Sequence, residues 1–224
     1  MQNIKKNFGV YYIYCQNDWK NIFVDQVNAI FNSKILEKVD RLYLSINYND
    51  ISDLEYINKY IAGVDKIKIS NSYTQNYFEF EALRVVQTLC LKYNCNVFYM
   101  HTKGAGISEA NKSFYHNATD LPYLLTCVAS WRKFMESYLL HKADLMLSKL
   151  VEYDACGVNL CEEPKKHFSG NFWWARSEYV NKLPKIDLLE RTNRWAAEFW
   201  IGSGDGAFLN LESNSNAGYN NIIK

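Results

Sequence analysis

The segment Asn96-Val-Phe-Tyr-Met-His-Thr-Lys-Gly104 is an apolar run that changes abruptly into a polar turn. Its length and its β-prone side chains predict a buried strand over 96–100. A helix is predicted just before it, over 78–93, because apolar side chains recur there on one helical face: Leu83, Val86, Leu89 and Cys90. Helix followed directly by strand is the repeating unit of a parallel sheet.

The residues before this segment have the same alternating order. Runs over 9–15, 41–46 and 66–69 predict further strands, and 18–33 predicts an amphipathic helix between the first two. Asn47-Tyr-Asn-Asp50 is a turn-like stop after the second strand. The order predicts an α/β fold with a mostly parallel sheet flanked by helices. Ligands of such sheets bind at the carboxyl ends of the strands, here 14–17, Asn47 and above all 101–104.

The second half of the chain is less regular. A polar loop over 105–119 leads into a long helical stretch over 121–151. Further elements are predicted downstream: a strand and turn over 154–159, a strand over 167–175 entered through a glycine, and helices over 177–182 and 194–201.

Length and composition predict one domain. The chain has 224 residues, 48% of them hydrophobic, which suffices for one sizeable core. We expect a domain over 1–212, with halves of about 1–105 and 106–212, and a polar tail over 213–224. The N-terminus runs directly into a strand-like segment without a long apolar stretch, which predicts a cytoplasmic protein with no membrane span.

Charge and cysteine usage narrow the classes of partner. The formal net charge is +1 with both signs interspersed, so no broad field attracts nucleic acid or an anionic membrane. The six cysteines lack CxxC spacing and mostly lie in apolar runs, which favours reduced core thiols over disulfides or a zinc site.

His101-Thr-Lys-Gly-Ala-Gly106 is the first candidate functional motif. A histidine and a lysine at a strand end, followed by two glycines that open the backbone, would suit a diphosphate. The motif is neither a P-loop nor GxGxxG. A solvated turn with Lys103 in water explains the spacing equally well.

His167-Phe-Ser-Gly-Asn-Phe-Trp-Trp-Ala175 is the second candidate. Adjacent tryptophans in a strand point to opposite faces, so one of them would be free to line a cleft. A tryptophan beside Asn171 and His167 suits the C–H face of a sugar. The alternative is that both are core residues of a sheet covered on both sides.

Glu198 is the third candidate, flanked by Ala196, Ala197, Phe199 and Trp200. A carboxylate among apolar residues has a raised pKa unless it is paired, as a general base for a sugar hydroxyl requires. A structural ion pair with Arg194, one turn earlier, is the alternative.

Six blocks in this order resemble a group of glycosyltransferase-like proteins found in microbial surface-glycan loci. The blocks begin at Glu79, Tyr99, Trp131, Gly157, His167 and Ala197, and the likeness extends roughly from 9 to 202. The resemblance implies a GT-A-like, Rossmann-like fold that transfers a sugar from a nucleotide-sugar to a glycan hydroxyl, in surface polysaccharide or glycoprotein glycan synthesis. A catalytically inactive carbohydrate-binding or scaffold module of the same fold is the alternative, and the chain would then belong to a larger glycan-assembly protein.

The resemblance also implies roles for individual residues. Proteins of the wider fold hold a divalent metal with Asp-x-Asp after the fourth strand, but this sequence contains no Asp-x-Asp and has His-Thr-Lys there. We therefore expect Lys103, with His101, Gly104 and Arg84, to neutralise the diphosphate without a metal. Manganese or magnesium held by a histidine beside Asp205 or Glu198 stays open.

The remaining expected contacts follow from position in the fold. The expected nucleotide contacts are Tyr14, Gln16, Asn47 and Glu79. The expected acceptor contacts are His167, Gly170, Asn171, Trp173 and Trp174. Glu198 is the expected general base of an inverting displacement, or a positioning residue if the enzyme is retaining.

Overall fold

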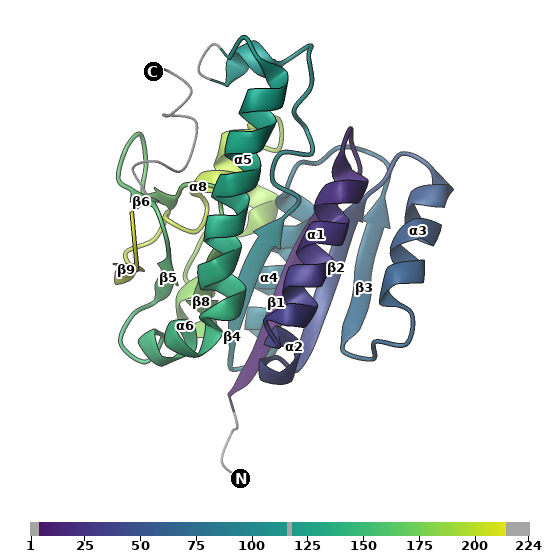
Figure 1. Cartoon of the computed structure of the whole chain (residues 1–224). Helices are drawn as coiled ribbons and strands as arrows, with labels where there is room; N and C mark the ends of the chain where they lie inside the picture. Colours follow the sequence, from purple (N-terminus) through teal and green to yellow (C-terminus); the bar gives the residue numbers. More distant parts are fainter. Residues whose placement is uncertain (1–4, 116–117, 214–224) are drawn as a thin grey trace.

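A computed structural model describes residues 5–115 and 118–213 (Figure 1). Its centre is a seven-stranded sheet in the order β3-β2-β1-β4-β8-β5-β9. β1 pairs in parallel with β2 and β4, β2 with β3, and β5 with β9, whereas β8 is antiparallel to both of its neighbours. In sheet order the strands are β3 (Ile67–Tyr73), β2 (Arg41–Asn47), β1 (Lys6–Tyr14), β4 (Cys95–His101), β8 (Trp173–Arg176), β5 (Ala155–Gly157) and β9 (Phe208–Asn210). The predicted mostly parallel sheet is confirmed.

Helices cover both faces of the sheet. In Figure 1, α1, α3 and α5 lie in front of the strands, and α4 lies behind them. The helices are α1 (Trp19–Asn32), α2 (Ile35–Lys38), α3 (Ile51–Ile61), α4 (Phe80–Lys92), α5 (Leu121–Glu136), α6 (Ala143–Lys149), α7 (Ser177–Val180) and α8 (Arg194–Phe199). Two short 3₁₀ turns, Lys112–Phe114 and Ile186–Leu188, and a π turn, Ser137–His141, complete the elements.

Alternation along the strands divides the core into two apolar clusters. On β1, Tyr11 and Ile13 pack in the cluster beneath α1 and α5, whereas Val10 and Tyr12 pack in the cluster beneath α4. All four side chains are buried, so this part of β1 is apolar on both faces of the sheet. The predicted core thiols fit this picture: all six cysteines are free, and four are buried.

The expected single strand over 167–175 is wrong. His167–Phe168 is strand β7, which pairs with β6 (Leu160–Cys161), and β8 begins only at Trp173. Between them Gly170 has φ +93° and Asn171 has φ +58°. Two consecutive residues with positive φ end the extended conformation, which separates β7 from β8.

Helix α3 follows the turn at 47–50, where the sequence analysis expected no helix. Its start carries a capping box, in which the Asp50 side chain accepts from Ser52 N and the Asp53 side chain accepts from Asp50 N. This pattern of two carboxylates is the sequence signal for the start of α3.

Two sequence-based expectations concern the ends of the chain and the membrane. Of the expected polar tail only Ser213 belongs to the described residues, and the remainder lies outside them. No helix in the described part of the chain has the length and apolarity needed to span a bilayer.

Candidate functional site

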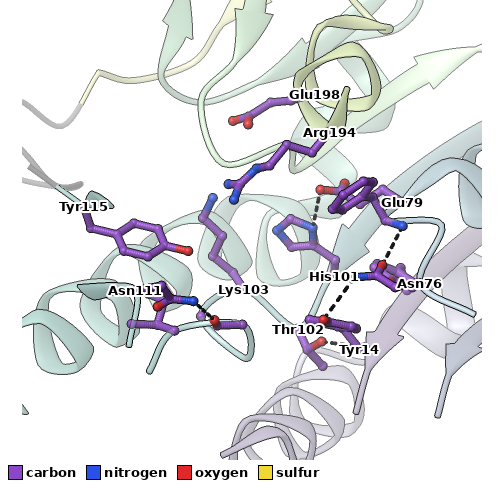
Figure 2. Close-up of a pocket in the computed structure, with 15 residues that line it drawn as sticks. Tyr14, Asn76, Glu79, His101, Thr102, Lys103, Asn111, Tyr115, Arg194 and Glu198 are labelled. Atoms are coloured by element: carbon purple, nitrogen blue, oxygen red, sulfur yellow. Dashed lines mark hydrogen bonds and ion pairs between the residues drawn. The ribbon is translucent and has the colours of Figure 1, made fainter. Parts of the chain in front are cut away.

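A pocket of about 260 Å³ opens at the carboxyl ends of β1 and β4, under the N-terminal turn of α8 (Figure 2). We call it the turn pocket, because the segment 101–107 forms much of its wall. It is lined by Tyr12, Tyr14, Asn76, Phe78, Glu79, His101, Thr102, Lys103, Gly104, Gly106, Ile107, Asn111, Tyr115, Arg194 and Glu198. The sheet edge favoured by the sequence is therefore hollowed.

The turn after β4 is fixed by its own backbone and by Thr102. Thr102 N donates to Tyr12 O (3.0 Å), and its Oγ1 accepts from Tyr14 N (2.9 Å), so the turn is fastened to the end of β1. Gly104 has φ +100°, and a Cβ there would come within 3.0 Å of Val128 Cγ1. The amides of Lys103 and Ala105 bond within the turn, so side chains supply most of the chemistry of this wall.

Two cationic side chains from distant parts of the sequence meet at the turn pocket. The Lys103 ammonium lies over the Trp131 ring, 4.7 Å from its centroid. Arg194 reaches the pocket from α8, with its guanidinium 4.9 Å from the Trp195 ring centroid. Figure 2 shows both side chains extending toward the same space. Charge near a low-dielectric wall acts strongly on an anion, so this pair suits a diphosphate.

Glu79 and His101 form a buried pair at another wall of the pocket. His101 Nδ1 lies 3.1 Å from Glu79 Oε1, and Glu79 Oε2 accepts from the Tyr99 hydroxyl (2.7 Å) and from Asn171 Nδ2 (2.6 Å). Burial raises the pKa of Glu79, but His101, the Tyr99 hydroxyl and Lys103 outweigh burial and lower it to about 2. His101 Nε2 is buried and has no hydrogen-bond partner among residues 5–115 and 118–213. Figure 2 shows the ring directed into the pocket.

Glu198 is half-buried on α8 and faces the same space as Lys103 (Figure 2). Its Oε1 accepts a long hydrogen bond from Gly170 N at 3.5 Å. No ion pair joins Glu198 to Arg194 among the contacts of residues 5–115 and 118–213, so the expected structural pair is not what holds this carboxylate.

A second pocket of about 230 Å³ adjoins the first. Lys103, Tyr115, Arg194 and Glu198 line both. We call it the Trp195 pocket, because the half-exposed Trp195 ring forms one wall and stacks on Phe199 with an interplanar angle of 16°. Its other lining residues are Phe114, Trp131, His167 and Ser169. Glu198 thus stands between two adjoining spaces.

Trp173 and Trp174 require a correction. They do point to opposite faces, but both are fully buried: Trp173 packs on Tyr99 and Trp174 on Phe98. Their indole N–H groups donate to Asn171 Oδ1 (2.7 Å) and Leu139 O (3.0 Å). Both are core residues, so neither contacts an acceptor.

Other expected acceptor contacts are also distributed differently. Asn171 is buried and bonds to Glu79, and Gly170 is buried against Met135, so both support the site from behind. His167 lines the Trp195 pocket, with Nδ1 2.7 Å from Lys165 O.

Arg84 requires a correction as well. Its guanidinium bonds to Glu81 at 2.8 Å and to Asp187, on the α4 face outside the turn pocket. Two carboxylates already neutralise its charge, so we remove Arg84 from the phosphate site.

The expected nucleotide contacts divide into two groups. Tyr14 and Glu79 line the turn pocket. Asn47 donates to Tyr73 O and Gln75 O, and Gln16 donates to Asn49 Oδ1. These two lie at the same sheet edge outside the pocket lining, and their contact with a nucleotide stays a prediction.

The acidic groups of the site do not fit a divalent cation. Mg²⁺ and Mn²⁺ bind several carboxylate or carbonyl oxygens. Both oxygens of Glu79 are engaged by His101, Tyr99 and Asn171, which leaves Glu198 as the pocket's other carboxylate. No cluster of three metal-ligating His, Cys, Asp or Glu side chains occurs within the described residues.

Sequence reasoning missed several residues of the site, among them Asn76, Tyr115, Arg194 and Trp195. Asn76 Nδ2 donates to the Tyr14 hydroxyl at 3.1 Å, from a loop that carries no motif. Arg194 and Trp195 open the helix that carries Glu198, and the Asn193 side chain caps that helix by accepting from Trp195 N (3.1 Å). The helix itself is predicted over 194–201, but its N-cap does not indicate which way it faces, so the sequence carries no signal that places these two side chains at the pocket.

The fold is shared with solved structures of low sequence identity. HddC from Yersinia pseudotuberculosis aligns with a TM-score of 0.50 at 10% identity, over 93% of this chain and 90% of that chain. Its complex with GMP-PN gives 0.52 at 9% identity with the same coverage. A Desulfovibrio desulfuricans G20 protein described as a nucleotide-diphospho-sugar transferase gives 0.48 at 10% identity, over 94% and 81%. At these identities the likeness concerns the fold alone.

The sheet, its covering helices and the fold shared with HddC define the class of fold as GT-A-like, with a mostly parallel sheet flanked by helices. Within that class the chain belongs to the family described as a domain of unknown function (DUF8361), which matches residues 11–193. No curated protein matches the sequence. The family description states no activity, so function must be argued from the site.

Proposed function

We propose that the chain is a glycosyltransferase that moves a sugar from a nucleotide-sugar to a hydroxyl of a glycan acceptor. The observation that carries this proposal is the meeting of Lys103, Arg194 and Glu198 at one pocket on the carboxyl edge of the sheet. Two cations suit the diphosphate that leaves, and one carboxylate suits the hydroxyl that attacks.

The donor diphosphate lies between Lys103 and Arg194 in this proposal. His101, oriented by Glu79, contributes its free Nε2 edge, and the Gly104 turn provides the floor. The nucleoside extends along the strand ends toward Tyr14 and Asn76, with Gln16 and Asn47 farther along the same edge. HddC, which shares the fold, has been crystallised with the nucleotide analogue GMP-PN, and this supports a nucleotide at that edge.

The acceptor occupies the Trp195 pocket. Its sugar ring contacts the half-exposed Trp195 ring, and its hydroxyl approaches Glu198 from that side. Glu198 takes the hydroxyl proton while the acceptor oxygen forms a bond to the anomeric carbon. The bond from that carbon to the diphosphate oxygen breaks, and the electron pair leaves on the diphosphate, whose charge Lys103 and Arg194 stabilise.

Lys103 and Arg194 supply positive charge where other proteins of this fold hold a metal ion with Asp-x-Asp. This supports a reaction that needs no divalent metal. In this proposal the protein works in the cytoplasm, in the synthesis of surface polysaccharide or glycoprotein glycan. The cytoplasmic location and the role in glycan synthesis are proposed because the HTKG and HFSGNFWWA blocks resemble those of surface-glycan proteins.

A thermal-shift screen of UDP-, GDP-, CMP- and dTDP-sugars tests the donor proposal, because a ligand that binds only the folded state raises the melting temperature. Each nucleotide-sugar is measured with manganese and with EDTA. Stabilisation by one nucleotide-sugar that persists in EDTA is the expected result. Stabilisation that appears only with manganese would refute the metal-free site, and no stabilisation by any donor would refute the proposed function.

A further inference from the structure

The block Trp131-Arg-x-x-Met-Glu136 lies on the last turns of α5, and the proposed function does not explain it. Its side chains reach the site from behind. The Trp131 ring lies beside the Lys103 ammonium, and Arg132 Nη1 donates to Lys103 O at 3.1 Å. Met135 packs against Gly170, where a Cβ would come within 2.4 Å of its sulfur. One face of α5 therefore contacts both turns that form the site.

A buried polar network continues from this block to α1 and β1. Gln26 Nε2 donates to Glu136 Oε1 (2.8 Å) and to His101 O (3.1 Å). Gln26 Oε1 accepts from the Tyr11 hydroxyl (2.8 Å). Arg132 Nε lies 3.5 Å from Glu136 Oε1. Gln26, Arg132 and Glu136 are each less than 5% exposed.

The network forms hydrogen bonds with two carbonyl groups of the turn after β4, which is the turn that binds the nucleotide-sugar in the proposed function. Arg132 holds the carbonyl of Lys103, and Gln26 holds the carbonyl of His101, so the backbone on both sides of Thr102 is fixed from the core. A buried ion pair loses much of its attraction to desolvation and stabilises a fold little compared with apolar packing. The network therefore contributes mainly to the position of the turn, because its hydrogen bonds are directional.

We infer that Arg132 is a positioning residue that, with Gln26 and Glu136, sets the place of Lys103 and His101 for the donor diphosphate. The inference rests on the proposed function for its ligand. The hydrogen bonds from Arg132 and Gln26 to the turn, which we call the brace, do not depend on that ligand. A π turn, Ser137–His141, begins directly after Glu136 and changes the helical register between α5 and α6.

The test compares three variants of the whole chain with inorganic pyrophosphate as the probe. Arg132→Met keeps a long side chain but removes the donor, Arg132→Lys restores a cation, and Lys133→Met removes the neighbouring exposed charge as a control. Losing a charged hydrogen bond that holds the turn should weaken pyrophosphate binding by about tenfold in Arg132→Met, measured by calorimetry. Arg132→Lys should recover part of the affinity, and Lys133→Met should match the wild type.

Hydrogen exchange gives a readout that a general loss of stability would not produce. In Arg132→Lys the amides of Lys103 and Ala105 should exchange faster, while amides within β4 exchange at the wild-type rate. This variant also keeps the test valid if Arg132→Met does not fold.

The outcomes separate the inference from the proposed function. A wild-type protein that does not bind pyrophosphate contradicts the proposed function, whereas exchange in the turn still tests the brace. Wild-type pyrophosphate affinity in Arg132→Met, or equal exchange of the turn in Arg132→Lys and wild type, would overturn the positioning role.

Discussion

Glu198 occupies the boundary between the turn pocket and the Trp195 pocket, which is where a base must stand to serve an acceptor from one side and a donor from the other. Its bond to Gly170 N is long, at 3.5 Å, so an incoming hydroxyl can replace it at little cost. In the proposed function this residue therefore acts in the reaction rather than in binding.

Glu198→Gln should therefore lower the transfer rate by about 10² or more, since the amide cannot accept a proton. Affinity for the donor should stay within about twofold, because the substitution leaves Lys103 and Arg194 in place. Radiolabelled transfer measures the first quantity and calorimetry the second. Glu190→Gln, an exposed carboxylate in the segment before α8, is the matched control, and transfer by Glu198→Gln at the control's rate would exclude Glu198 as the base.

Single residues also show where sequence reasoning reaches its limit. The turn of Lys103 and His101 and the carboxylate of Glu198 were predicted to face one site, and all three line one pocket. The burial of Trp173 was left open, because whether a strand is covered on both faces depends on helices elsewhere in the chain. The partner of His101 was not predicted, since Glu79 reaches it from 22 positions away and only the fold brings them together.

At the scale of elements, the turn between β7 and β8 joins the two halves of the site. Its glycine has φ +93° and contacts Met135 of α5, and the amide of the same residue reaches Glu198 of α8. The sequence predicted one continuous strand here. Apolar and aromatic side chains favoured a strand, but packing against α5 requires the positive φ that only a turn provides.

Gly170→Ala should lower the free energy of unfolding by about 2–3 kcal/mol, because it combines positive-φ strain with overpacking against Met135. Gly63→Ala is the matched control: its φ is +78°, but no atom lies within 4 Å of its Cβ position. The control should therefore lose only about 1 kcal/mol from backbone strain. Urea unfolding of both variants checks the difference, and equal losses would show that the Met135 contact does not constrain the turn.

At the scale of the whole molecule, the buried network that ends at Glu136 links stability to pH. Burial raises the pKa of Glu136 from its ordinary 4.5 to about 7, against the opposing effect of Arg132 and Gln26. The folded protein therefore binds the proton more tightly than the unfolded chain does. This contribution to stability is fully present below about pH 4.5 and is lost as pH rises toward 7.

The loss of stability across that window should be roughly 3 kcal/mol, at about 1.4 kcal/mol for each unit of pKa.

The pKa shift of Glu79 affects stability in the opposite direction. Its pKa is lowered to about 2, so its contribution is present above pH 4.5 and is lost as pH falls toward 2. Glu136→Gln should flatten the decline of unfolding free energy between pH 5 and 7, measured by urea titration at each pH. A variant whose profile keeps the wild-type slope would show that another group governs it.

The fold as a whole was largely predictable, because strand and helix periods in the first half specify a parallel sheet whatever the loops do. Helix α3 was not predicted although Asp50 and Asp53 form a capping box, and the break between β7 and β8 was not predicted because it depends on tertiary packing. The residues of the site were likewise predicted only in part. Residues at strand ends were found, whereas Arg194 and Trp195 come from a short helix whose orientation only the assembled fold determines.

Whether the Lys103 turn holds a diphosphate is measured by the binding of nucleoside diphosphates, and of the matching nucleosides, to the wild type and to Lys103→Ala. Losing one charged contact should weaken diphosphate binding by about tenfold to a hundredfold and leave nucleoside binding nearly unchanged. Lys59→Ala, an exposed lysine on α3, should behave like the wild type. Equal losses for diphosphate and nucleoside, or no loss for either, would contradict the claim.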